Sequence, residues 1–356
     1  MGDKTVLEAL AEFVRARTTA EELDALREGQ GLFLPSAAGA EVSDLMASQD
    51  PAELTANVVS VRNLMPGGDL FHTAVLALLC GTLVERGADP GAAIDATLDL
   101  FIQQLDALAD QRRRDDRIRT ERTLTDRIVT DRIMTDGIVT TAGQLTFMAT
   151  MTMLSRSVGT RKRWRGRPEL MARLDGLEEA GLVPWFLREV FTLHDDVDLL
   201  LLDPKNRRAY QFRMVGVRDR LYHCYALLQD ALLRHTGPGY LGAEPVDPDM
   251  VRYARNRDLG EEEFGQDDPG RERMHDHLRF NFSVPGAVIM PGSASPSELP
   301  TLDGLPFLLV EPKGMSINWN PSNMYGVVHE ALAASVELVR EFDQERAEVL
   351  FVKCGF

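Results

Sequence analysis

The chain has 356 residues, of which 44% are hydrophobic and 26% are charged. This composition is typical of a globular protein with enough apolar residues for one large core or two smaller ones. The formal net charge is -16, which argues against general binding to nucleic acids or anionic membranes, because phosphate contacts require clustered Lys and Arg. We therefore expect no membrane partner, and we do not favour nucleic acid as a partner.

The basic residues and cysteines indicate where the protein is found. Of the 39 basic residues only five are lysine, and this skew indicates a GC-rich bacterial gene. Cys80, Cys224 and Cys354 are widely spaced and form no motif, which predicts reduced thiols in a cytoplasm. The first residues carry acids and lack a sustained apolar segment, so we expect no secretory signal and a cytoplasmic location.

The first 110 residues are predicted to form a helical domain. Apolar residues recur at helical spacing in 5–17 and 20–27, and residues 71–86 follow a Pro-Gly-Gly turn. Another helix is expected from Asp89-Pro90 to about residue 109, because an acidic cap followed by proline favours a helix start.

A five-residue echo occupies residues 116–140, which read DRIRT, ERTLT, DRIVT, DRIMT and DGIVT. In a helix each copy rotates by roughly 140°, so the isoleucines form no stripe. In a strand the odd period places them on alternating faces. We predict that residues 111–142 are a repeat-containing linker or insertion, solvated or irregularly helical; a specific interaction surface is the alternative.

A basic cluster follows the apolar segment 145–154, which is predicted to be a core helix. Arg161, Lys162, Arg163 and Trp164 are its centre. Such a group could hold an anionic partner, with the tryptophan stacking on a base. The simpler interpretation, which we favour, is a solvated loop that pairs with nearby acids.

The pattern from residue 168 onward changes to mixed helix and strand. Alternating apolar residues around the turn at Asp203-Pro204 predict a β-hairpin. We expect helices at 168–179, 184–193 and 218–235, strands at 197–202, 207–215, 277–284, 286–292 and 305–312, a helix from 320 to about 342 and a strand at 349–353.

These elements predict an α+β fold. Its helical N-terminal half precedes a mixed α/β-like C-terminal half, which contains the β-hairpin and a terminal strand-helix-strand unit. The predicted domains are 1–110, the linker or insertion 111–142, and an α+β domain at 143–356.

One candidate for catalysis lies at the carboxyl end of strand 305–312. Asp303, Glu311 and Lys313 outline a metal-dependent nuclease, in which the carboxylates would hold a divalent ion and the lysine would stabilise the attacked phosphate. Against this, acid-Pro-Lys is also typical of a turn and recurs at Asp203-Pro204-Lys205. We favour the turn.

Two further groups are weaker candidates for metal binding. His275 and His277 share one face of a predicted strand but have no further ligand at diagnostic spacing. His194 begins a cluster with Asp195, Asp196 and Asp198 that could hold magnesium. We favour a structural role for the cluster, with His194 in the last turn of a helix. No metal site is assigned.

A glycine-rich segment, Gly237 to Gly242, matches the dinucleotide-binding fingerprint letter for letter. It follows a predicted helix instead of a strand, and prolines follow it, so the helix start that would hold a phosphate is missing. We do not expect a dinucleotide site.

The leading hypothesis is a non-catalytic intracellular bacterial protein that acts through protein–protein contacts, with self-association as one form of contact. It needs no cofactor. Its predicted contact residues are Arg161, Lys162, Arg163, Trp164 and Trp319. The alternative is a metal-dependent hydrolase or nuclease acting on phosphate esters or nucleic acid through Asp303, Glu311 and Lys313, with a divalent metal as cofactor.

Overall fold

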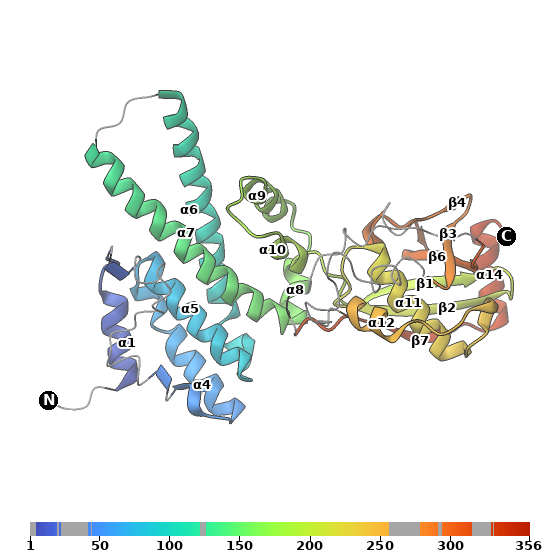
Figure 1. Cartoon of the computed structure of the whole chain (residues 1–356). Helices are drawn as coiled ribbons and strands as arrows, with labels where there is room; N and C mark the ends of the chain where they lie inside the picture. The colour runs from blue at the N-terminus through green and yellow to red at the C-terminus, as the bar shows by residue number, and fades with distance from the viewer. Residues whose placement is uncertain are drawn as a thin grey trace. The chain divides into compact units, whose positions relative to one another are not determined.

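The chain folds into two compact units, which are labelled by element in Figure 1. The computed structural model describes residues 5–19, 21–22, 42–43, 45–121, 126–255, 278–290, 294–314, 329 and 331–356. The helical unit comprises residues 1–160 and 166–188, and the α+β unit comprises residues 161–165 and 189–356. Among the described residues, no helix is both long and apolar enough to cross a membrane.

Three helices of the first unit begin at acidic or hydroxyl caps. Thr5 forms a capping box with Glu8 ahead of α1, and the side chains of Asp50 and Asp69 accept backbone N–H groups at the starts of α4 and α5. The helices of this unit are α1 (Val6–Arg15), α4 (Pro51–Arg62), α5 (Leu70–Glu85), α6 (Ile94–Glu121), α7 (Asp126–Ser155) and α9 (Pro168–Glu179). Two further helices, α8 (Val158–Trp164) and α10 (Trp185–Val190), span the limits between the units.

The core of the helical unit forms around α5, which is apolar on nearly every side and packs against α7 and α4. The edge-to-face contact between Phe101 on α6 and Phe147 on α7 joins the next pair of helices, with the ring centroids 5.9 Å apart. The expected helices at 5–17, 71–86, 145–154 and 168–179 are thereby confirmed.

The five-residue echo lies on the long pair of helices α6 and α7 (Figure 1). Residues 116–121 and 126–140 are helical, which agrees with the helical form of our prediction and not with an extended linker. Ile138 is half-buried; the side chains of the other isoleucines in the echo lie outside the described residues. The segment 111–142 falls inside the helical unit.

The second unit contains a mixed seven-stranded sheet in the order β4-β3-β6-β1-β2-β7, with β5 paired to β6. Among the described strands, only β1 and β6 are parallel neighbours. The strands are β1 (Val197–Asp203), β2 (Arg208–Val215), β3 (Phe280–Val284), β4 (Ala287–Val288), β5 (Thr301–Leu302), β6 (Leu305–Pro312) and β7 (Ser335–Glu341). The helices are α11 (Leu221–Thr236), α12 (Pro248–Ala254) and α14 (Gln344–Cys354). An α+β fold with a helical N-terminal half is therefore confirmed.

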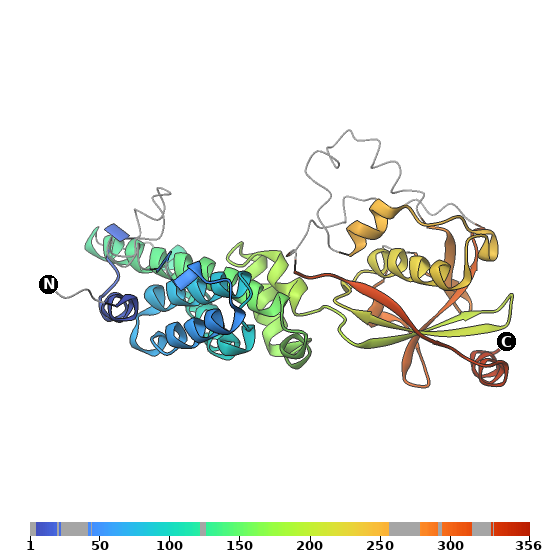
Figure 2. The same ribbon diagram turned by 90° about the horizontal axis from the view of Figure 1, so that it is seen from below.

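Helices cover both faces of the sheet (Figure 2). Leu199 and Leu201 of β1 join the core under α11 and α12, whereas Leu200 and Leu202 join the core under α14. Alternating side chains of one strand point to opposite faces, so a run of four leucines requires an apolar layer on each side.

Two expectations for the C-terminal segment are wrong. Residues 335–341 form strand β7 instead of continuing a helix, and residues 344–354 form helix α14 instead of containing a strand. The terminal strand-helix-strand unit is thus not formed by these residues. Val336 packs into the core beside β2, while Asp343 caps α14 and Gly355 ends it with φ 88°. Apolar burial at alternating positions selects the strand, and the two caps select the helix.

A charged network joins β2 to β7 and to the end of α11. Glu341 accepts hydrogen bonds from Arg208 at 2.7 and 2.8 Å, and His235 Nε2 lies 2.9 Å from the same carboxylate. The hydrogen bonds from Arg208, with a smaller contribution from His235, lower the pKa of Glu341 to about 2. Its normal pKa is 4.5.

This lowered pKa predicts a loss of stability in acid. The stabilisation due to Glu341 is present above its unfolded pKa of 4.5 and is lost as the pH falls towards 2, because the unfolded chain takes up the proton first. The difference in urea midpoint between wild type and Glu341→Gln should therefore narrow across this interval. Arg208→Gln should show the same narrowing, and a difference that stays constant down to the lowest pH would contradict the assignment.

Candidate functional site

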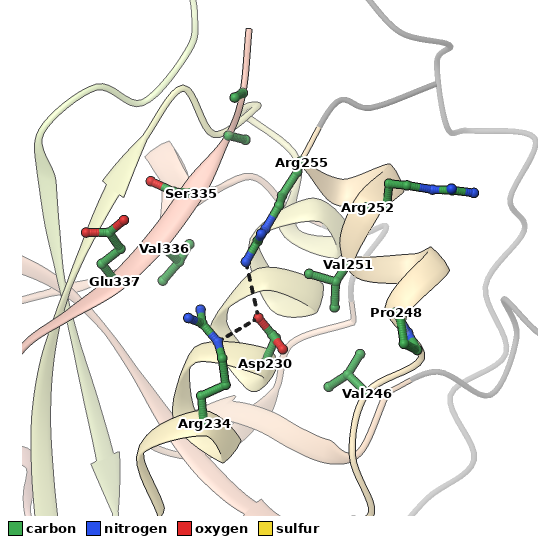
Figure 3. Close-up of a pocket in the computed structure, with 12 residues that line it drawn as sticks. Asp230, Arg234, Val246, Pro248, Val251, Arg252, Arg255, Ser335, Val336 and Glu337 are labelled. Atoms are coloured by element: carbon green, nitrogen blue, oxygen red, sulfur yellow. Dashed lines mark hydrogen bonds and ion pairs between the residues drawn. The ribbon is translucent and has the colours of Figure 1, made fainter. Parts of the chain in front are cut away.

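A groove of about 800 Å³ lies in the α+β unit between α11, α12 and the start of β7 (Figure 3). Val246, Val251 and Val336 contribute apolar wall, and Asp230, Arg234 and Arg255 contribute charge. A hollow of this size, in which apolar and charged side chains line the walls in similar measure, has room for a ligand. We call it the α12 groove.

Two arginines of the α12 groove converge on one carboxylate, while Arg252 and Glu337 of the lining lie apart from this group (Figure 3). Arg234 Nε donates to Asp230 Oδ2 at 3.1 Å, and Arg255 Nη2 lies 3.6 Å from the same oxygen. Arg252 also lines the groove, but its side chain is directed away from this group. Two guanidinium groups share one carboxylate, so positive charge is in excess here although the chain as a whole is acidic.

Strand β7 forms one wall of the groove and is also an edge of the sheet. Among the described strands, β7 pairs with β2 alone. A shift in register between Gln211 and Phe212 leaves the residues from Ser335 to Leu338 regularly paired with β2. Alternate backbone N–H and C=O groups of an edge strand point away from the sheet. The regular part of this edge is the part that borders the groove.

The groove is closed at one end by the backbone. Ala334 N donates to Arg255 O at 3.1 Å, which ties the start of β7 to the residue after α12. Gly216, with φ 64°, lies below this junction, where an added Cβ would lie 3.4 Å from Ala333 O. The glycine allows the end of β2 to pass close to this wall.

The predicted basic cluster lies on α8 and is paired with the predicted acidic cluster. Arg161 is buried and donates to both oxygens of Asp195 at 2.8 Å, and Gly216 N donates to the same carboxylate at 3.0 Å. Lys162 contacts Asp196 at 2.9 Å, and this hydrogen bond lowers the pKa of Asp196. The expected pairing with nearby acids is confirmed, although the segment is helical and not a loop.

His194 lies at the centre of a second network in the same region. Arg165 Nη2 lies 2.7 Å from His194 Nδ1, and His194 Nε2 lies 2.7 Å from Asp219 Oδ1. Ser297 Oγ donates to the other oxygen of Asp219 at 2.8 Å. Burial raises the pKa of Asp219, but its hydrogen bonds from His194 and Ser297 outweigh this effect and lower it.

The location of His194 corrects our prediction. His194 forms an isolated β-bridge with Val217 instead of occupying the last turn of a helix, because α10 ends at Val190. Its imidazole is buried between a guanidinium and a carboxylate. This arrangement orients side chains across the entry to the hairpin and is structural in character.

The predicted contact residues are not all at the surface. Arg161 is buried against Asp195, so it does not belong to an exposed contact surface. Lys162 and Arg163 are exposed, and the ring of Trp164 lies 6.5 Å from that of Phe191. Trp319 lies outside the described residues.

The structure separates the three residues of the metal-dependent alternative. Asp303 occupies the turn before β6, whereas Glu311 lies near the other end of β6, roughly 20 Å of strand away. Asp303 and Gly304 have φ values of 53° and 80°, as the two central residues of a tight hairpin turn require. Asp303 also forms ion pairs with Arg346 and Lys353 of α14, which lower its pKa.

The segment around Glu311 differs from the expected turn. Glu311 and Pro312 belong to β6 and pair with Asn281 and Phe280 of β3. The side chains of Glu311 and Lys313 are exposed. By contrast, the matching Asp203-Pro204-Lys205 segment is confirmed as the turn of the β1–β2 hairpin.

The structure does not support the other candidate metal and nucleotide sites among the residues it describes. No group of three or more His, Cys, Asp or Glu side chains among the described residues is arranged to hold a metal. His275 and His277 lie outside these residues. The glycine-rich segment forms a short turn in which Tyr240 hydrogen-bonds to Tyr210 at 2.9 Å and to the buried Asp203. Burial, together with Asp203, raises the pKa of Tyr240 to about 12.

Sequence reasoning did not find the residues of the α12 groove. Asp230 and Arg234 are four residues apart on a helix that was correctly predicted, and this spacing places them on one face. Arg255 follows α12, a helix that was not predicted, and the β7 wall was expected to be helical. No sequence spacing connects these three segments.

Comparison with known proteins offers no relative from which a function could be inferred. No protein-family model, no curated protein and no solved structure matches the chain.

The buried pair of Arg161 and Asp195 should make a large contribution to stability. Removing one partner from a buried ion pair leaves an uncompensated charge, so Arg161→Met should lower the free energy of unfolding by about 3–5 kcal/mol in urea titrations. The exposed Lys205→Met should change it by about 0.5 kcal/mol or less. Addition of Asp195→Leu to Arg161→Met should recover part of the loss, and no recovery would argue against a simple charge pair.

Proposed function

We propose that the protein is a non-catalytic binding protein of the bacterial cytoplasm, and that it takes an extended segment of a partner protein into the α12 groove. The proposal depends chiefly on one observation: a groove of about 800 Å³ lies along the regularly paired part of an edge strand. An added strand would hydrogen-bond to β7 through its backbone, while its alternate side chains would meet the walls of the groove.

The composition of the groove favours binding over catalysis. Arg234 and Arg255 both form ion pairs with Asp230. Val246, Val251 and Val336 line it with branched apolar side chains, which pack against another side chain but take no part in acid–base chemistry. The metal-dependent alternative has no comparable support, because Asp303 is paired with α14 and Glu311 lies at the other end of β6.

Filling the groove should abolish binding. Ala333 is an exposed residue of its wall, so Ala333→Trp would place a large ring in the path of an added strand. Peptides selected from a random display library on the wild-type full chain should bind Ala333→Trp at least about tenfold more weakly, measured by fluorescence anisotropy. Val352→Trp on α14, at a site that is 69% exposed, is the matched control and should bind like wild type.

Two results would reject this function. One is that the selection yields no peptide that binds the wild-type chain; the other is that selected peptides bind Ala333→Trp as tightly as wild type. Light scattering on the same samples tests self-association: a mass of one chain at high concentration identifies the partner as a different protein.

A further inference from the structure

We infer that the α12 groove recognises an acidic residue of the bound segment, whose carboxylate is held by Arg234 and Arg255. This inference rests on the proposed function and adds the chemical class of the partner: an extended polypeptide that combines apolar side chains with one Asp or Glu.

The charge in the groove supports an anionic ligand. Asp230 Oδ2 is the acceptor nearest to both guanidinium groups, at 3.1 Å from Arg234 Nε and 3.6 Å from Arg255 Nη2. The groove lining carries three arginines against two carboxylates, Asp230 and Glu337. Arg234 and Arg255 share Asp230, so a further carboxylate placed between these two guanidinium groups would be attracted. The side chains of Arg234 and Arg255 are 57% and 42% exposed, which leaves them accessible from the groove.

The hydrogen-bonding capacity of Arg255 points in the same direction. Its Nε atom is buried, and no acceptor for it is present among the described residues. At 3.6 Å, its Nη2 contact with Asp230 is an ion pair beyond hydrogen-bonding distance. A guanidinium group binds a carboxylate through two parallel N–H groups, so an incoming carboxylate would pair with the remaining N–H groups of Arg255, which Asp230 does not bind at hydrogen-bonding distance.

Asp230 acts as a positioning residue in this arrangement. It lies one helical turn before Arg234 on α11 and is mostly buried, with 20% of its side chain exposed. By binding both arginines it draws side chains from α11 and from the end of α12 to one point (Figure 3). Arginines that are already oriented lose less rotamer freedom when a ligand binds.

The walls of the groove favour a polypeptide over a free anion. Val246, Val251 and Val336 lie beside the charged group, and the edge of β7 runs along it. A small anion would use the arginines alone, whereas an extended segment would also bury apolar side chains and pair with the strand. The favoured ligand therefore has its acid flanked by apolar residues at alternate positions.

The test uses selected peptides with acetylated and amidated ends, each made in two forms that differ by Glu→Gln or Asp→Asn. On the wild-type full chain the acidic form should bind about tenfold or more tightly than the amide form, measured by calorimetry. On Arg234→Gln/Arg255→Gln the two forms should bind equally. Arg346→Gln on α14, which changes an arginine that is 45% exposed and is not among the residues lining the groove, should retain the full preference for the acid.

A second pair of measurements separates a specific contact from general charge attraction. Arg255→Lys keeps the charge but loses the two-pronged geometry, so it should lose part of the preference. Thermal unfolding of each variant checks that the fold is retained. Equal binding of the acidic and amide forms to wild type would overturn the inference, as would an equal loss of preference in Arg346→Gln.

The outcomes distinguish this inference from the function on which it rests. If neutral peptides bind the wild-type chain but not Ala333→Trp, the groove is a peptide-binding site and the proposed preference for an acidic residue is rejected. Submillimolar binding of inorganic phosphate alone, abolished in Arg234→Gln/Arg255→Gln, would assign the arginines to a free anion instead. Peptide binding that appears only after Glu261, Glu262 and Glu263 are changed to glutamine would assign the groove to an acidic segment of this chain and overturn the proposal.

Discussion

Burial of both faces of β1 and β6 is the constraint on which the α+β unit depends. Four consecutive leucines of β1 alternate between the two cores, and Phe307 to Val310 of β6 do the same beside them. Each fully buried leucine contributes about 2 kcal/mol of hydrophobic stabilisation. Because α11 and α12 cover one face and α14 the other (Figure 2), these central side chains are buried in the two cores. Exposed backbone is left at the edges, and one of these edges borders the α12 groove.

The main basic and acidic clusters of this protein form ion pairs with each other. The one basic cluster in the sequence meets the densest acidic cluster, through Arg161 with Asp195 and Lys162 with Asp196. A buried, hydrogen-bonded pair of this kind is costly to break from one side, although an apolar pair of the same size could replace it at little cost. Its effect is to specify where α8 lies against the entry to the hairpin. The α12 groove differs because two arginines there share one acid.

The metal-dependent alternative shows how little proximity in sequence says about proximity in a sheet. Asp303 and Glu311 are eight residues apart, a spacing that would bring them close together in a turn. In a strand the same spacing carries them to opposite ends. The Asp-Gly pair at 303–304 is a known signature of a two-residue hairpin turn, so the structural role of Asp303 was readable from the sequence, whereas its partners on α14 were not.

Local signals in the sequence determined most of the elements. Periodicity and caps placed the helices of the first unit, and alternation placed the β1–β2 hairpin, β3 and β6. They failed after residue 320, where Leu338, Val339 and Phe342 fit a helical stripe, and where Asp343 and Gly355 were overlooked as the caps of α14. Only tertiary structure decided that Ser335–Glu341 is a strand. Pairing with β2 supplies its backbone hydrogen bonds and places Val336 in the core, and this favours the strand over a helix. The α12 groove also exists only in three dimensions, since Asp230, Arg255 and β7 belong to three segments that packing alone brings together.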